Sequence, residues 1–76
     1  MNNTRRKAIA ALMEKLEALK DEVEALQEEE QECFDNLPEG IQMSERGEAM
    51  EEAASNLESA FSSLEEALEY LEEASN

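Results

Sequence analysis

The stretch Leu37-Pro38-Glu39-Gly40-Ile41-Gln42-Met43 contains the only proline of the 76-residue chain and one of its two glycines. Pro38 ends the helix before it, because proline lacks a backbone N–H and disfavours the helical conformation of the preceding residue. Proline is tolerated in a first helical turn, so Pro38 can also begin a single turn through Ile41 or Gln42. Residues 37–43 are therefore predicted to connect two helices, with Leu37, Ile41 and Met43 covering that end.

The segment before this connection, about residues 4–36, is predicted to be one helix. Its apolar residues alternate in spacings of three and four, which is the heptad pattern of a coiled coil with a and d positions facing a neighbouring helix. Glu30 occupies one a position, and Thr4 is the expected N-cap. The apolar a positions are Ile9, Leu16, Val23 and Leu37, the d positions are Leu12, Leu19, Leu26 and Cys33, and a second stripe contains Ala11, Ala18 and Ala25.

The segment after the connection, about residues 44–75, is predicted to be a second helix with Ser44 as its N-cap. Its a and d residues are Ala54, Leu57, Phe61, Leu64, Leu68 and Leu71, and alanines at 53, 60, 67 and 74 recur every seven residues. Each helix is about 50 Å long at about 1.5 Å per residue. A short connection between equal arms predicts an all-α fold: a single domain, residues 1–76, that is an antiparallel, coiled-coil-like helical hairpin.

The chain is short for a protein that must be stabilised by one core. Its single cysteine cannot form an internal disulfide. Two helices alone would leave much of the leucine and alanine surface in water, so we expect a homo-oligomer, a four-helix or larger bundle. The candidate interface residues are Ala11, Ala18, Ala25, Ala53, Ala60, Phe61, Ala67 and Tyr70.

The residue types present exclude most site chemistry. There is no histidine and only one cysteine, which removes histidine-based dyads and triads and soft-ligand metal sites. Neighbouring glutamates such as Glu65 and Glu66 point apart on a helix, and no calcium-loop spacing occurs. The sequence therefore predicts a protein that is not an enzyme and uses no metal or cofactor. No long apolar run is present, which predicts a cytoplasmic protein without membrane contact.

Charge is distributed unevenly along the chain. There are 21 acidic and 6 basic residues, for a net charge of −15; residues 1–20 carry +3, residues 21–52 carry −12 and residues 53–76 carry −6. Direct DNA binding is not expected, because like charges repel. The negative end is interpreted either as a surface that binds a basic site on a protein or as a solvated face that keeps the chain soluble. The acidic residues concerned are Glu28, Glu29, Glu32, Glu45, Glu48, Glu51 and Glu52.

The segment Ser44-Glu45-Arg46-Gly47 combines a cation and a glycine in a first helical turn, where neither favours the helix. One hypothesis is an anion site, formed by Ser44, the free N–H groups and Arg46, with Gly47 allowing close approach. Arg5, Arg6 and Lys7 would complete a nucleotide site between protomers. The alternative is that Arg46 pairs with nearby glutamates, Gly47 admits Leu37 or Ile41, and the N-terminal cluster pairs with the acidic C-terminal tail.

The connecting segment Asn36–Glu39 and Gln42–Glu48, with the opening Asn3–Lys7, resembles small acidic helical-hairpin proteins encoded by phages and mobile elements of gut Firmicutes, most of them hypothetical. The resemblance implies a phage-type accessory protein in the host cytoplasm. Small binders of that origin often block host defences by occluding an effector or sequestering its nucleotide signal. We therefore expect a non-enzymatic binding protein that inhibits a host antiviral defence through its acidic surface. The alternatives are an oligomeric sponge for an anionic nucleotide and a purely structural oligomerisation module.

Overall fold

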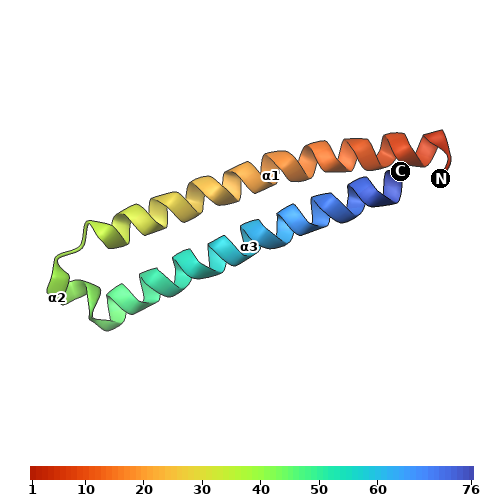
Figure 1. The fold of residues 1–76 in the computed structure, drawn as a ribbon. Coiled ribbons are helices and arrows are strands. Elements are labelled where there is room, and N and C mark those ends of the chain that lie inside the picture. Colours follow the sequence, from red (N-terminus) through yellow and green to blue (C-terminus); the bar gives the residue numbers. More distant parts are fainter.

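The computed structural model describes all 76 residues as a hairpin of two long helices and one short one. The helices are α1 (Asn3–Asp35), α2 (Glu39–Gln42) and α3 (Glu45–Ser75). α1 and α3 run antiparallel, α2 closes one end, and both termini lie at the other end (Figure 1). The rod measures 58 × 15 × 12 Å. The predicted all-α hairpin is confirmed, and assembly of several chains into a bundle stays a prediction.

α1 is unbroken through its run of glutamates and begins one residue earlier than predicted. The N-cap prediction was wrong: Asn2, and not Thr4, caps the helix. The Asn2 side-chain oxygen accepts a hydrogen bond from the backbone N–H of Arg5 at 2.8 Å. Asparagine is at least as good an N-cap as threonine, so its capping moves the helix start toward the terminus.

The connection holds α2 against the end of α1 and the start of α3. The carbonyl of Pro38 accepts hydrogen bonds from the N–H groups of Ile41 (2.9 Å) and Gln42 (3.0 Å), which makes the predicted single turn. The side-chain amide of Gln42 donates to the carbonyl of Phe34 at 3.0 Å and to that of Asp35 at 3.4 Å, and the Phe34 carbonyl also accepts from the N–H of Leu37 at 3.1 Å. These hydrogen bonds help to satisfy the last carbonyls of α1. Ser44 is confirmed as the N-cap of α3: its hydroxyl accepts from the N–H of Gly47 at 3.4 Å and donates to the carbonyl of Ile41.

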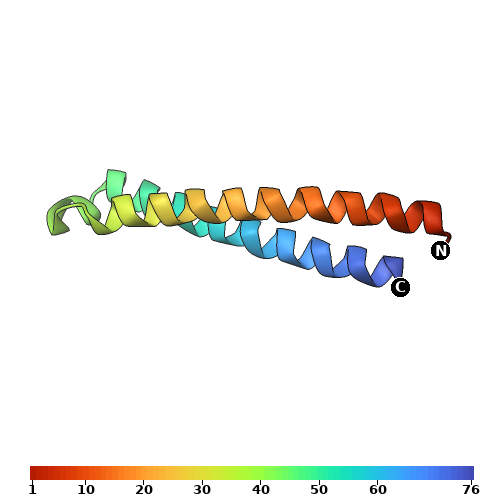
Figure 2. The same ribbon diagram turned by 90° about the horizontal axis from the view of Figure 1, so that it is seen from above.

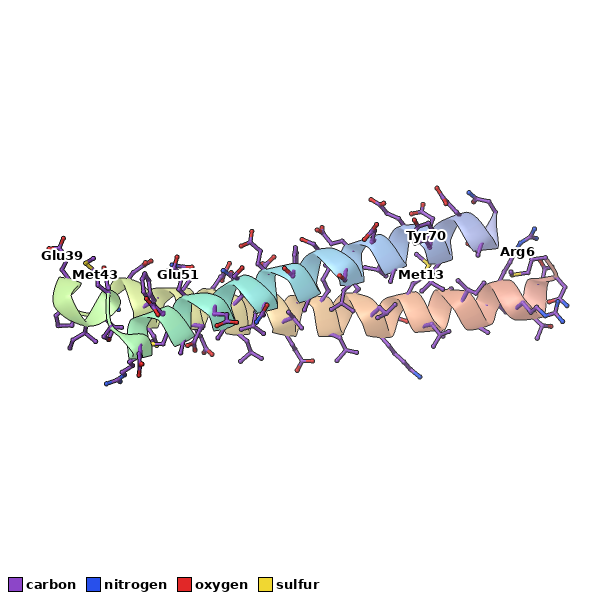
Figure 3. The ribbon with its side chains drawn as sticks, turned by 90° about the horizontal axis from the view of Figure 1, so that it is seen from below. Arg6, Met13, Glu39, Met43, Glu51 and Tyr70 are labelled. Atoms are coloured by element: carbon purple, nitrogen blue, oxygen red, sulfur yellow. The ribbon has the colours of Figure 1, made fainter.

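The prediction that Leu37, Ile41 and Met43 cover the connected end of the hairpin is only partly correct. Leu37 is half-buried, but Ile41 is 39% exposed and Met43 is 81% exposed. Figure 3 shows Met43 pointing outward from the turn. Backbone fills this place instead, because Gly47 is buried against the main chain of Ile41 and Gln42. The close approach that glycine permits is therefore to a backbone segment.

α1 presents to α3 a face that is rotated from the predicted one. The a residues Ile9, Leu16 and Val23 are half-buried as expected, but the d residues Leu12, Leu19, Leu26 and Cys33 are exposed. The e positions take their place facing α3: Met13, Lys20, Gln27 and Phe34 are all half-buried. Figure 3 shows Met13 between the two helices. α3 keeps its predicted face, and Ala54 and Leu68 are the only buried hydrophobic residues of the chain.

Two contacts fix the register between the long helices. The Arg6 guanidinium donates to the carbonyl of Ser75 at 3.0 Å, and the Lys20 ammonium lies 5.4 Å from the ring centre of Phe61. These contacts are fourteen residues apart on both helices, so the register is the same along the rod. Figure 2 shows α1 and α3 crossing at a shallow angle, as expected for coiled-coil-like packing.

Candidate functional site

Two open grooves run between α1 and α3, one on each side of the hairpin. The first, of about 300 Å³, is lined by Glu24, Gln27, Glu28, Glu58 and Phe61. The second, of about 520 Å³, is lined by Leu26, Glu29, Glu30, Glu32, Cys33, Asn36 and Leu57. Glu24 and Leu26 are two residues apart, which is about 200° around a helix. The two grooves therefore lie on opposite sides. Each is lined by three glutamates, and the second also contains Leu26, Cys33 and Leu57.

The first groove belongs to a longer surface, called here the acidic side. Glutamates recur every seven residues along α3, and carboxylates recur with the same spacing along α1. The residues are Glu51, Glu58, Glu65 and Glu72 of α3 and Glu14, Asp21, Glu28 and Asp35 of α1, and all eight are exposed. Sequence reasoning missed this surface because it summed the charge of each segment and applied the seven-residue repeat only to apolar residues. The charged residues have the same seven-residue period, and that period is the signal that would have identified them.

The acidic side is almost without counter-charge. The only ion pair of the chain joins the ammonium of Lys20 to Glu17 at 3.0 Å. The pKa of Lys20 is raised, mainly by its hydrogen bond to Glu17 and further by the charges of Glu17, Glu65 and Asp21, while partial burial opposes the shift. The Lys20 side chain is 16% exposed and covers the ring of Phe61. This cation is therefore held inside the hairpin, and the exposed carboxylates around it stay available to a partner.

The opposite surface is called here the apolar side. Leu12, Leu19 and Leu26 are 50%, 52% and 53% exposed. Ala60 lies about 200° around α3 from Glu58, so it is on the side of Leu57, which lines the second groove. The apolar side consists of Leu12, Leu19, Leu26 and Cys33 of α1 together with Ala53, Ala60 and Ala67 of α3. It forms a strip of large and small apolar residues in which Ala53 and Ala67 are half-buried and the leucines, Cys33 and Ala60 are exposed.

The seven acidic residues predicted to form one partner surface are all exposed, but they do not share one side. Glu28 lines the acidic groove, and Glu51 belongs to the same side. Glu29 and Glu32 line the groove that contains Leu26 and Cys33 instead. The remaining three, Glu45, Glu48 and Glu52, lie in the first turns of α3. The predicted set therefore surrounds the turn end, whereas the acidic side extends along the whole rod.

The structure does not bring the predicted anion-binding residues together within one chain. The Ser44 hydroxyl already makes two hydrogen bonds, and Gly47 is covered by backbone carbonyls, which repel an anion. Arg46 is exposed and has no ion pair. Arg5, Arg6 and Lys7 lie at the other end of a 58 Å rod, where Arg6 donates to the last turn of α3. A nucleotide site that uses both groups stays a prediction about an oligomer.

The predicted interface residues also divide between different faces. Phe61 is half-buried inside the hairpin under Lys20. Ala11, Ala18 and Ala25 are exposed on the face of α1 that points away from α3, since Ala18 is about 200° from both Leu16 and Lys20. Tyr70 is 66% exposed and lies at the edge of the apolar side. Ala53, Ala60 and Ala67 are the predicted residues that belong to the apolar side.

Other kinds of site receive no support from the geometry. No three acidic or cysteine side chains converge closely enough to hold a metal ion. Neither long helix is apolar enough over 18 residues to cross a membrane. Comparison with protein-family models, with curated proteins and with solved structures yields no match. The resemblance to phage-encoded hairpins therefore stays a prediction, and function has to be argued from the two sides of the rod.

Proposed function

We propose that this protein is a non-enzymatic binding protein whose acidic side occupies a basic site on a protein partner. The observation that carries the proposal is the row of exposed carboxylates along both helices, in which Lys7 is the one cation that continues the α1 row and Lys20–Glu17 is the only ion pair. In the phage-type setting that the sequence suggests, the partner is a component of a host antiviral defence, and the hairpin inhibits it by occlusion.

The geometry of the acidic side suits a basic cleft that normally holds nucleic acid. Carboxylates seven residues apart on a helix are about 10 Å apart, and the rod carries them on two adjacent helices. Lysine and arginine side chains that neutralise phosphates can pair with such carboxylates instead. Many separate pairs of this kind speed association and make affinity fall steeply with salt. The expected mode of action is competition with nucleic acid for the same cleft.

Rigidity supports this mode over a flexible acidic tail. α1 and α3 pack along their whole length, and both ends are tied: by Arg6 to Ser75 at one end and by Gln42 to Phe34 at the other. The carboxylates are therefore held in position before binding, and less conformational entropy is lost when a partner binds.

The test compares two variants with equal net charge. The first neutralises the acidic side with Glu28→Gln, Glu51→Gln, Glu58→Gln and Glu65→Gln. The control neutralises four exposed glutamates elsewhere, with Glu29→Gln, Glu32→Gln, Glu66→Gln and Glu73→Gln. Each protein is immobilised and exposed to a bacterial lysate, and captured basic proteins are identified by mass spectrometry and then titrated in purified form.

The wild type and the control are expected to capture the same basic protein, and the acidic-side variant is expected to lose it. Purified partner should bind the acidic-side variant at least tenfold more weakly than the control at about 0.15 M salt. Equal capture and equal affinity for both variants would refute a role for the acidic side, provided that circular dichroism shows all three proteins to be equally helical.

A further inference from the structure

The hairpin exposes more surface than a compact chain of its mass. Its accessible surface is 5679 Å² for 8.6 kDa. A compact monomer of this mass exposes about 4,700 Å². The excess of about 1,000 Å² is close to the ~800 Å² that each partner buries in a standard protein–protein interface. Since only Ala54 and Leu68 are buried hydrophobic residues, one chain lacks most of a core, and its excess area is enough for one stable interface.

The apolar side is where that interface is available. The register set by Lys20 and Phe61 places Ala60 at a level between Leu19 and Leu26. By the same register Ala67 lies between Leu12 and Leu19, and Ala53 between Leu26 and Cys33. Large and small apolar residues thus alternate along the strip, which lets the side chains of an identical strip interdigitate with it. The acidic side cannot serve this purpose, because two copies would place like charges together.

Charge decides which way a second copy lies. The turn half of the hairpin, residues 21–56, contains thirteen acidic residues and Arg46, for a net charge of −12; the open half, residues 1–20 and 57–76, carries −3. Two copies that lie in the same direction would place two turn halves, each with a net charge of −12, against each other. Two copies in opposite directions place each −12 half against a −3 half, which lowers the repulsion.

Opposite directions also match the specific residues beside the leucines. Leu19 is the midpoint of α1, which spans Asn3–Asp35, so a two-fold axis at Leu19 overlays the whole helix on its copy. Leu12 then meets the partner's Leu26. Lys15, beside Leu12 and Leu19, meets the partner's Glu22, and this pair occurs twice. Arg5, Arg6 and Lys7 lie level with residues 31–33 of the partner, inside its acidic segment.

We propose that a second copy of this chain covers the apolar side in the opposite direction and forms a four-helix bundle centred on Leu19. The argument uses the exposed leucines, the excess surface and the charge of the two halves, and it is independent of any partner of the acidic side. The two acidic sides point outward in such a bundle.

The oligomeric state is measured by sedimentation equilibrium and native mass spectrometry of the full chain. The wild type is expected at twice the chain mass of 8.6 kDa. Leu19→Asp places two carboxylates at the two-fold axis and should lower dimer affinity by at least a hundredfold. Ala18→Asp adds the same charge to the neighbouring residue on the outer face and should leave the dimer intact. A wild type that stays monomeric at about 100 μM, or a Leu19→Asp variant that dimerises like Ala18→Asp, would overturn the proposal.

Crosslinking tests the direction without depending on a destabilised variant. In the opposite-direction bundle the two Cys33 residues are 28 residues apart along the rod, or about 42 Å, so a short bis-maleimide should not join them. Leu19→Cys in a Cys33→Ser background should crosslink almost completely, because position 19 meets itself. Efficient crosslinking of wild-type Cys33 would overturn the proposed direction, and failure of Leu19→Cys to crosslink would overturn the proposed centre.

Discussion

Replacing Gly47 by alanine tests whether the connection is held by close contact of its backbone with α3. Gly47 lies in the first turn of α3 and is buried. A Cβ added there would lie 2.5 Å from the carbonyl oxygen of Ile41 and closer still to the carbonyl oxygen of Gln42. Both obstacles are main-chain atoms, so they cannot turn aside as the end of a flexible side chain can.

The magnitude follows from two opposing effects. Alanine in place of glycine stabilises an exposed helix position by about 1 kcal/mol. The added Cβ would lie within 2.5 Å of three main-chain atoms of residues 41–42, so this segment has to move by about 1 Å to reach ordinary van der Waals contact. Overpacking of this kind costs about 1–3 kcal/mol. Displacement also weakens the Gln42 hydrogen bond to Phe34 and the Ser44 cap, which contribute about 1 kcal/mol each. Gly47→Ala should therefore destabilise the protein by about 1–3 kcal/mol, against the direction of helix propensity.

Gly40 provides the matched control. It lies inside α2, its φ is not positive, and a Cβ there would meet nothing within 4 Å. Gly40→Ala should therefore stabilise the protein by about 0.5–1 kcal/mol, since only the unfolded chain loses freedom. Thermal unfolding followed by circular dichroism, at one chain concentration for all proteins, should show Gly47→Ala melting about 5–15 °C below the wild type and Gly40→Ala a few degrees above it. A Gly47→Ala protein that is as stable as Gly40→Ala would refute the close backbone contact.

Three further predictions concern charge and capping. Because the pKa of Lys20 is raised, its stabilising interaction with Glu17 is present below pH 10.5 and is lost as the pH rises above that value. Lys20→Met should remove this part of the loss of stability at alkaline pH. Melting temperatures of the two proteins between pH 8 and pH 11 measure the difference. Raising NaCl from about 10 mM to about 150 mM should raise the melting temperature, because salt screens the repulsion among the acidic residues of the turn half, residues 21–56. A lower melting temperature would contradict the idea that this repulsion destabilises the hairpin. Gln42→Ala should cost about 1 kcal/mol in chemical denaturation, whereas Gln31→Ala, which removes only a solvent-exposed hydrogen bond to Asp35 on the same helix, should cost less than about 0.5 kcal/mol.

The hairpin and its boundaries were predictable because local rules decide them. Pro38 ends one helix and Ser44 caps the next, and both act within a few residues of where they occur. The predicted helices, 4–36 and 44–75, differ from α1 and α3 by one residue at three of the four ends and agree at the fourth. Asn2 replaced Thr4 as the cap because two good capping residues lie close together at the start of the chain.

The face of α1 was not predictable from the apolar pattern alone. The d positions contain three leucines and Cys33, whereas the e positions include Lys20 and Gln27, so the apolar pattern favours the d stripe. Only the position of α3 decides which stripe it covers, and it covers a and e. The role of Gly47 was similarly hidden, because the neighbour that excludes a side chain is the returning backbone and not an apolar residue. Both features depend on the path of the chain in three dimensions.

The apolar side and the acidic side face opposite ways, so a second copy of the chain and a basic partner would not compete for the same surface. Leu12, Leu19 and Leu26 are suited to contact with an identical strip, and the carboxylates at Glu51 and Glu58 face the other way. A bundle closed through the leucines would therefore present two acidic sides on opposite outer faces, related by the two-fold axis. Such a dimer should bind two copies of a basic partner, or two basic sites of one symmetric partner with an avidity that exceeds the single-site affinity by about a hundredfold or more.

Titration of a purified partner measures this directly. The wild type should bind one partner site per chain, and Leu19→Asp should keep the affinity for a single site but lose the gain from binding two sites at once. Loss of single-site affinity in Leu19→Asp, with helicity retained, would instead show that the partner binds the leucines, and the separation of the two sides would be wrong.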